Sequence, residues 1–482
     1  MNSTRLLFRL GAILLQFSSL AWAAEQGRDY AVVVSGDTYQ DLAWREVVTT
    51  LLNNHHASII TYTGTVQTAL GELRAKFPRY VCFVAQPAEA TRSFVAQVHR
   101  LTRSLNDDPY PDCFWGILTG YDAANALRIA QHQEPLTIRK IAAGTEIPLE
   151  LCGEGKWYSE LEPGLQVVKE KGGSPVTNRV PADTTKPLVE ALTQFRADLF
   201  LTSGHATERD WQIGYKYRNG SFRCAEGVLY GEDTTGGKHQ ISSPNPKIYL
   251  PIGNCLMGHI DSTNAMALAF MNSAGVLQMM GYTVNTWYGY AGWGCLDYFI
   301  EQPGRYTFEE AFLANEVALI HRLQTFFPDQ TSAELDDRGR FSKPVSISTA
   351  AREAGLNAQD ATGLVYDRDT VAFYGDPGWI ARMADGPLGW EQKLSRNGTE
   401  WSFEITPRRG ENSFQPLSSN GSQRGGRPFI QFFTNRLENI EVVSGRELNP
   451  VVTATFLLVP NPGKSETSRS YKVVFRATSM RQ

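Results

Sequence analysis

Two short segments of this chain carry a thiol and an imidazole directly after strand-like apolar runs. His205 lies in the segment Thr202-Ser203-Gly204-His205-Ala206, and Cys255 ends the segment Ile252-Gly253-Asn254-Cys255. The runs before them, residues 197–201 and 247–252, are short and apolar, which favours buried strands of a parallel sheet. Catalytic groups gather at the carboxyl ends of such strands. If the two strands are neighbours, Cys255 and His205 leave the same edge of the sheet as a nucleophile and its acid–base partner.

The thiol of Cys255 needs a specific environment to act as a nucleophile. Only the thiolate reacts, so the pKa of the thiol must be lowered by a nearby imidazolium or by a helix N-terminus. His205 can supply the imidazole, and a helix predicted over residues 262–271 can supply its N-terminus. The competing interpretation is that Cys255 is a small buried apolar residue and His205 a loop histidine, since unpaired cysteines are commonly buried for packing.

A zinc site is a further interpretation of the same residues. Cys255 and His259 lie four residues apart, and His205 could join them. Structural zinc sites, however, usually show paired cysteines or histidines at close spacing. We therefore predict no metal and no other cofactor.

The elements that must position this chemistry belong to the second of two α/β blocks. In the first block, strands are predicted at residues 30–34, 58–62, 80–85 and 113–119, alternating with helices at 44–52, 66–77, 94–105 and 123–130. This alternation indicates parallel strands covered by helices. Residues 152–185 are rich in glycine, proline and polar residues, which predicts a linker or an extended surface segment. The second block follows, with helices at 187–195, 262–271 and 308–323 and further strands at 275–280 and 370–374.

The character of the sequence changes beyond about residue 386. Trp401, Phe403 and Ile405 alternate with polar residues, and strand-like runs follow at 428–433, 439–443, 451–459 and 471–476. Several short strands with turns between them predict a small β-sandwich. The expected organisation is a signal peptide over 1–23, an N-terminal α/β subdomain over 24–150, a catalytic α/β subdomain over 151–385 and a β-sandwich over 386–482.

The N-terminus and the composition set the compartment and exclude some partners. Arg5 and Arg9 precede an apolar run over residues 10–20 and then Ala21-Trp22-Ala23, which is the pattern of a secretory signal cleaved after Ala23. The apolar run is too short to span a bilayer, so we expect a secreted or periplasmic protein with no membrane span in the mature chain. The 46 basic and 50 acidic residues form no basic patch, so no nucleic-acid partner is expected. Six cysteines are too few for a disulfide scaffold in 482 residues, and their pairing cannot be deduced from the sequence.

The segments around His205 and Cys255 resemble the two active-site motifs of the caspase-like clan of cysteine peptidases, and within that clan the gingipain family. The likeness extends to residues 30–34, to residues 116–129 and to Phe373-Tyr374-Gly375-Asp376-Pro377. It implies two caspase-like parallel-sheet subdomains followed by an immunoglobulin-like β-sandwich, in the order predicted above from the sequence pattern. It also implies a Cys–His dyad that cleaves peptide bonds in proteins or peptides through an acyl-enzyme.

The resemblance assigns a role to each residue of the motifs. Cys255 would attack the scissile carbonyl, and His205 would protonate the leaving amine and then activate water. The backbone N–H groups of Cys255 and Ala206 would hold the oxyanion. Ala206 stands where the family usually has glycine, and Asn254 matches the motif loosely. An alanine still supplies the N–H, but it would be strained if the position required a positive φ.

Substrate-binding residues are harder to assign from the sequence. Trp287 and Tyr288 follow the strand after the nucleophile helix and are predicted walls of a substrate pocket, although aromatic residues are as common in cores. Asp261 or Asp297 could select a basic side chain, but no motif places either in a pocket. Two functions follow: a secreted cysteine endopeptidase, or a catalytically inactive caspase-like protein that acts as a secreted binding or adhesion module. The segment Arg424-Gly425-Gly426-Arg427 is predicted to be a loop.

Overall fold

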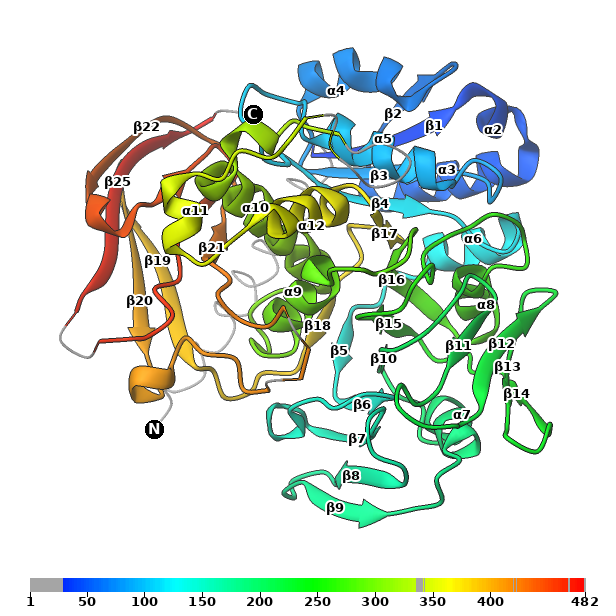
Figure 1. Ribbon diagram of the computed structural model, residues 1–482. Coiled ribbons are helices and arrows are strands. Elements are labelled where there is room, and N and C mark those ends of the chain that lie inside the picture. Colours follow the sequence, from blue (N-terminus) through cyan, green and yellow to red (C-terminus); the bar gives the residue numbers. More distant parts are fainter. Residues whose placement is uncertain are drawn as a thin grey trace, which may run out of the picture.

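A single twelve-stranded sheet runs through the computed structural model, which describes residues 29–334, 341, 343–418, 420–421, 423–466 and 469–480 (Figure 1). The expected signal peptide over residues 1–23 lies outside the described residues. The strand order across the sheet is β2-β1-β3-β4-β17-β16-β15-β10-β6-β7-β8-β9. In the part of the chain that the structure describes, no helix is long and apolar enough to cross a membrane.

The first half of the sheet is the alternating block that the sequence predicts. Its strands are parallel, because the chain returns through a helix after each of them: β1 (Tyr30–Ser35), β2 (Ser58–Tyr62), β3 (Tyr80–Val84) and β4 (Phe114–Leu118). The connecting helices are α2 (Gly36–Gln40), α3 (Leu42–His55), η1 (Val66–Ala69), α4 (Leu70–Lys76), α5 (Arg92–Thr102) and α6 (Ala123–Gln131). Side-chain caps fix where the longer helices begin; Asp41 accepts the N–H groups of Ala43 and Trp44 at the start of α3.

The second half of the sheet carries the candidate site. Its strands are β6 (Lys140–Ala143), β7 (Glu154–Tyr158), β8 (Leu165–Lys169), β9 (Val176–Arg179), β10 (Leu199–Thr202), β15 (Lys247–Pro251) and β16 (Val276–Tyr282). Of the two alternatives for residues 152–185, a linker or an extended surface segment, the linker is wrong, because β7, β8 and β9 extend the sheet there. These strands were not predicted because their sequences are polar. β9, at the edge of the sheet, is exposed at all four positions.

The two halves meet at β17 (Val371–Tyr374), which comes from late in the chain. β17 pairs parallel to β4 and antiparallel to β16, so the strands of the second half other than β8 run opposite to those of the first half. The α/β class is therefore confirmed, but the parallel sheets expected for two subdomains are replaced by one continuous mixed sheet.

Helices and a small sheet cover the second half. The helices are α7 (Thr185–Thr193), α8 (Met266–Ser273), α9 (Tyr290–Phe299), α10 (Phe308–Phe326), α11 (Thr349–Glu353) and α12 (Ala358–Arg368), with 3₁₀ turns η2 (Leu149–Leu151) and η3 (Pro328–Gln330). Between β10 and β15 the chain forms an antiparallel sheet of β11 (Asp210–Gln212), β12 (Ser221–Ala225), β13 (Val228–Glu232) and β14 (Lys238–Ile241). Phe222 of this sheet stacks on Phe200 of β10 with ring centroids 5.9 Å apart. A short pair, β5 (Leu136–Ile138) and β18 (Ala381–Met383), completes this part.

The C-terminal region is all β, as predicted. One antiparallel sheet contains β19 (Trp390–Asn397), β20 (Glu400–Pro407), β25 (Tyr471–Ser479) and β22 (Leu437–Ser444), and a second contains β21 (Phe429–Phe432), β24 (Phe456–Val459) and β23 (Val451–Val452). Two 3₁₀ turns, η4 (Gly410–Asn412) and η5 (Arg446–Leu448), lie between strands. The two sheets share a core in which Phe403 and Phe475 of the first pack with Phe429 and Leu457 of the second. They lie beside α10 and α11 (Figure 1, orange to red).

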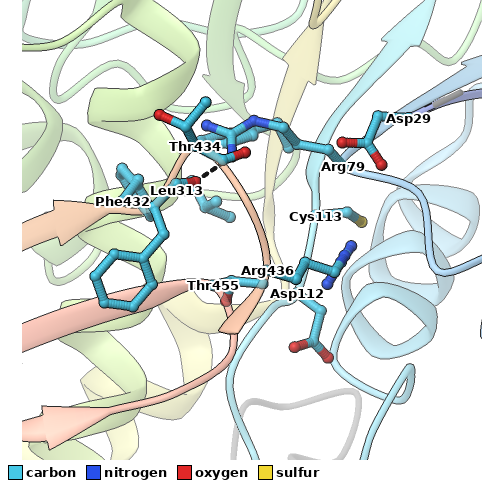
Figure 2. Close-up of a pocket in the computed structure, with 11 residues that line it drawn as sticks. Asp29, Arg79, Asp112, Cys113, Leu313, Phe432, Thr434, Arg436 and Thr455 are labelled. Atoms are coloured by element: carbon cyan, nitrogen blue, oxygen red, sulfur yellow. Dashed lines mark hydrogen bonds between the residues drawn. The ribbon is translucent and has the colours of Figure 1, made fainter. Parts of the chain in front are cut away.

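Two arginines form hydrogen bonds between the C-terminal region and the first half of the large sheet. Arg79 Nη1 donates to the carbonyl of Thr434 at 2.9 Å, and Arg436 Nη2 donates to the carbonyl of Pro78 at 2.8 Å. Figure 2 shows the Arg436 guanidinium beside Asp112 and Cys113, at a small cavity of about 20 Å³. Burial raises the pKa of Asp112 to about 8, and the charge of Arg436 opposes that rise.

Candidate active site

The strands that precede His205 and Cys255 are neighbours, as the sequence analysis required. β10 and β15 pair in parallel, with Thr202 opposite Pro251 at their carboxyl ends. His205 follows three residues after Thr202, and Cys255 follows four residues after Pro251. The topology therefore brings both segments to one edge of the sheet.

The buried side chain of Asn254 joins the two segments. Its Oδ1 accepts a hydrogen bond from the Thr202 hydroxyl at 2.6 Å, and its Nδ2 donates to the carbonyl of Gly204 at 3.2 Å. The Thr202 hydroxyl also lies 2.9 Å from the hydroxyl of Tyr249, which fixes its position. The residue before Cys255 is thus bonded to the residue before His205. Asn254, a loose match to the family motif, is a structural link between the two loops.

The sulfur of Cys255 is half-buried and receives one backbone hydrogen bond. The N–H of Thr286 donates to Cys255 Sγ at 3.2 Å, and the Thr286 hydroxyl donates to the carbonyl of Asn254 at 3.1 Å. The expected helix N-terminus is not the source of this contact. α8 begins only at Met266, and the N–H of that residue donates to the carbonyl of Glu208.

The imidazole of His205 is exposed. Its ring packs against Tyr215, with centroids 4.8 Å apart and an interplanar angle of 34°. Within the described chain no carboxylate forms a hydrogen bond with this ring. The packing against Tyr215 limits the orientations open to the His205 imidazole.

Among the described residues, neither the N–H of Ala206 nor that of Cys255 has a hydrogen-bond acceptor. Ala206 forms an antiparallel bridge with Trp211 in which the hydrogen bonds belong to the flanking residues, Thr207 N to Asp210 O and Gln212 N to His205 O. The N–H of Ala206 therefore takes no part in the hydrogen bonds between these two segments. Ala206 does not have a positive φ, so alanine is unstrained where the family usually has glycine. The N–H of Cys255 likewise has no acceptor among the described residues.

Of the two predicted pocket residues, Trp287 is plainly not part of the core. Its side chain is 70% exposed, one residue beyond Thr286. Tyr288 is half-buried, and its ring centroid lies 5.6 Å from that of Tyr366. The hydroxyl of Tyr366 donates to the carbonyl of Asn285 at 3.0 Å, which holds the segment that contacts the Cys255 sulfur.

Asp297 is not available to select a basic side chain, and Asp261 already pairs with an arginine at the surface. Asp297 is buried and accepts hydrogen bonds from Arg424 Nε at 2.6 Å and from the N–H of Gly425 at 2.8 Å. Asp261 pairs with Arg209 at 2.7 Å. The segment from Arg424 to Arg427 is a loop, as predicted, but its function is to anchor the C-terminal region on α9.

Glu160 is an acidic residue near the site that the sequence reasoning missed. It is 5% exposed, and its Oε1 accepts the Thr145 hydroxyl at 2.8 Å. A β-carbon on Gly204, which has φ +89°, would lie 3.2 Å from Glu160 Oε2. Burial raises the pKa of Glu160 to about 7, although the hydrogen bond from Thr145 opposes the rise. The sequence did not indicate Glu160 as a site residue, because the residues around it were interpreted as a linker or an extended surface segment.

A loop of the C-terminal region reaches the same place. Asn420 Nδ2 donates to Glu146 Oε2 at 2.9 Å and to the Thr145 hydroxyl at 3.3 Å. Gly421 lies against the indole of Trp293, so closely that a β-carbon there would be 2.4 Å from the ring. The C-terminal region therefore contacts Thr145 and Glu146, close to Glu160, and also Trp293 of helix α9.

No family model, curated protein or solved structure matches this chain. The assignment of function accordingly depends on the site itself. All six cysteines are free thiols: Cys82, Cys113, Cys152, Cys224, Cys255 and Cys295. Across the described ranges, no group of three or more His, Cys, Asp or Glu side chains is placed to hold a metal ion, including the combination of Cys255, His205 and His259.

Proposed function

We propose that the protein is a secreted cysteine endopeptidase that hydrolyses peptide bonds through Cys255 and His205. The observation that carries this proposal is the Asn254 link, which ties the residue before the thiol to the residue before the imidazole. A structural cysteine and a loop histidine would need no such connection. The gingipain resemblance, with its caspase-like α/β part and immunoglobulin-like C-terminal sandwich, supports the same reaction class.

The reaction uses groups that the site supplies. Cys255 attacks the scissile carbonyl as a thiolate, with the Thr286 N–H stabilising its charge before attack. His205 protonates the leaving amine, which departs and leaves a thioester on Cys255. The imidazole then removes a proton from water, the hydroxide attacks the thioester, and the carboxylic product leaves with the thiol restored.

The negative charge on the tetrahedral oxygen is held by the backbone. The N–H groups of Cys255 and Ala206 are the donors, and both are free of other acceptors in the described chain. Preorganised donors of this kind contribute about 3 to 4 kcal/mol each to the stabilisation of a transition state. Trp287 would contact the substrate from the exposed rim of the site.

The experiment compares two cysteines of the same chain with a thiol-reactive peptidyl probe. Cys224 is the matched control because it is also half-buried, yet burial raises the pKa of its thiol to about 11. We expect Cys255→Ala to abolish labelling and cleavage of a diverse peptide library, and Cys224→Ala to retain both. Full peptide cleavage by the Cys255→Ala protein would contradict the proposal.

The same experiment decides the second function. A folded mature chain that neither reacts with the probe nor cleaves peptides would be the inactive binding or adhesion module instead. Secretion has its own test, because the proposed signal peptide places the mature N-terminus at Ala24. N-terminal sequencing of the exported protein reads that residue directly.

A further inference from the structure

A cavity of about 400 Å³ lies between helix α10 and the C-terminal region. From α10 it is lined by Leu319 and Arg322, among others, and from the C-terminal region by Arg427 and Pro428. None of its described lining residues belongs to the Cys255 and His205 site. Its volume is within the range of small-molecule sites in proteins.

The lining carries positive charge and, among the described residues, contains no aspartate or glutamate. Arg322 makes no hydrogen bond or ion pair with the described residues, and its guanidinium lies 5.8 Å from the centre of the Tyr290 ring. The Nη2 of Arg427 donates to the carbonyls of Tyr290 and Gln423, but its Nε is buried without a hydrogen-bond acceptor. That Nε is 3.9 Å from Asp297 Oδ2, too far for a hydrogen bond.

The charges of these two guanidinium groups are only partly compensated, because Arg427 shares Asp297 with Arg424 and Arg322 has no hydrogen-bonded partner among the described residues. Burial lowers the pKa of Arg322 and the charge of Arg427 lowers it further, against the smaller opposing effects of Tyr290 and Asp360. Such charges are usually paired, because an unpaired charge loses its hydration without gaining a partner. His321, in the same lining, does not add to the positive charge at neutral pH, because burial lowers its pKa to about 4. An anion between the two arginines would offset the cost.

The other residues that line the cavity indicate which chemical group is attached to the anion. Ala318, Leu319, Phe326, Leu356 and Pro460 give the cavity a largely apolar surface. A small inorganic anion would leave this surface unfilled, whereas a hydrocarbon group would bury it. The planar guanidinium matches a carboxylate with two parallel hydrogen bonds. We propose that this cavity binds a small carboxylate with an apolar side group, held by Arg322 and Arg427.

The proposal is independent of peptidase activity and is tested by binding alone. Isothermal titration of the full mature chain with hexanoate should show one site, and hexanamide, which has the same shape without the charge, should bind at least about tenfold more weakly. Arg322→Gln should lose affinity for hexanoate by a similar factor. Arg223→Gln is the control, because Arg223 forms an exposed pair with Glu232 in the β11–β14 sheet and should leave binding unchanged.

Three outcomes would overturn the proposal. Equal affinity for hexanoate and hexanamide would show a purely apolar cavity, and equal affinity of the wild-type and Arg322→Gln proteins would place hexanoate elsewhere. Sulfate that displaces hexanoate and binds more tightly would show an inorganic-anion site. The first comparison uses the unmodified protein, so it stands even if Arg322→Gln fails to fold.

Discussion

The side-chain amide of Asn254 donates a hydrogen bond to the carbonyl oxygen of Gly204 across 50 residues of sequence. Its carbonyl oxygen accepts the hydroxyl of Thr202 in turn, so one buried amide spans the ends of β10 and β15. The parallel ladder sets the positions of the strands, but the loops beyond them have no ladder. Asn254 supplies the missing connection at the point where Cys255 and His205 emerge.

Asn254→Ala should slow the reaction of Cys255 without unfolding the protein. Loss of the two hydrogen bonds frees the loops, and a misplacement of about 1 Å in reacting groups can reduce a rate about a hundredfold. We expect the second-order rate of labelling by a peptidyl probe to fall about ten- to a hundredfold. Asn272→Ala is the matched control, since the Asn272 amide also donates to a glycine carbonyl, that of Gly227, at 2.9 Å away from the site. An unchanged labelling rate in Asn254→Ala would leave the link without a role in catalysis.

Glu160→Gln should change the pH dependence of stability. The folded state raises the pKa of Glu160 from 4.5 to about 7, so the protonated carboxyl is favoured and the cost of folding grows as pH rises through that interval. Glutamine removes the charge and keeps an acceptor for Thr145. Relative to wild type, the variant should gain up to about 3 kcal/mol in free energy of unfolding between pH 4.5 and pH 8.

Thermal unfolding at the two pH values measures this difference. The control is Glu190→Gln, which removes a more exposed carboxylate on α7 and should change the free energy of unfolding by less than about 1 kcal/mol at either pH. A Glu160→Gln protein that differs from wild type equally at both pH values would show that Glu160 does not titrate in this range.

The predictable part of the fold is the part with strong local patterns. The strand β1 (Tyr30–Ser35) and the helix α10 (Phe308–Phe326) are both expected from the sequence. A continuous apolar run is enough to predict the strand, and apolar residues at helical spacing over a long segment are enough to predict the helix. β17 was also expected as a strand. Its position between β4 and β16 was not, because the direction in which a strand enters a sheet depends on partners far away in sequence.

The same limit applies to the candidate site. Cys255 and His205 were found from their residue types and from the strands before them. Glu160 and Asn420 carry no such pattern, and both act near the site through tertiary contacts with Thr145 and Glu146. Asp297 is a case in which the residue type alone misleads. The sequence offered it as a residue that could bind a basic substrate, but in the structure its carboxylate is paired with Arg424.

His55 should stabilise the protein in a pH-dependent way. Its Nε2 lies 2.7 Å from Asp376 Oδ2, and its ring stacks on Tyr30 with centroids 4.1 Å apart. Burial lowers the pKa of His55, but the charge and hydrogen bond of Asp376 outweigh this, and the pKa is raised above 6.5. The stabilisation is therefore complete below about pH 6.5 and is lost as pH rises through the raised value.

His55→Asn should cost about 1 to 2 kcal/mol in free energy of unfolding at pH 6 and less at pH 9. Asp376 remains ionised over this range, because its pKa is lowered, so the change reports on the histidine. His56→Asn is the control: His56 is exposed with φ +49°, a conformation that asparagine tolerates, so its loss of stability at pH 6 should be smaller than that of His55→Asn. Denaturant unfolding monitored at both pH values would contradict the prediction if the two losses were equal.

Arg424 should be essential for attachment of the C-terminal region. Its guanidinium, 3% exposed, pairs with Asp297 on α9 and with Glu301 just after that helix, and Glu301 also accepts the N–H of Leu417 at 3.0 Å. Arg424→Met leaves the buried Glu301 carboxylate without its cation and Asp297 with only the more distant Arg427, a change that should cost about 3 to 5 kcal/mol. Limited proteolysis should then cut the chain near residues 417–427 faster than in wild type. Arg408→Met breaks an exposed pair with Glu391 and should cost less than about 1 kcal/mol. Similar stabilities for the two variants would show that the C-terminal region is held mainly by other contacts, such as those of Arg79 and Arg436.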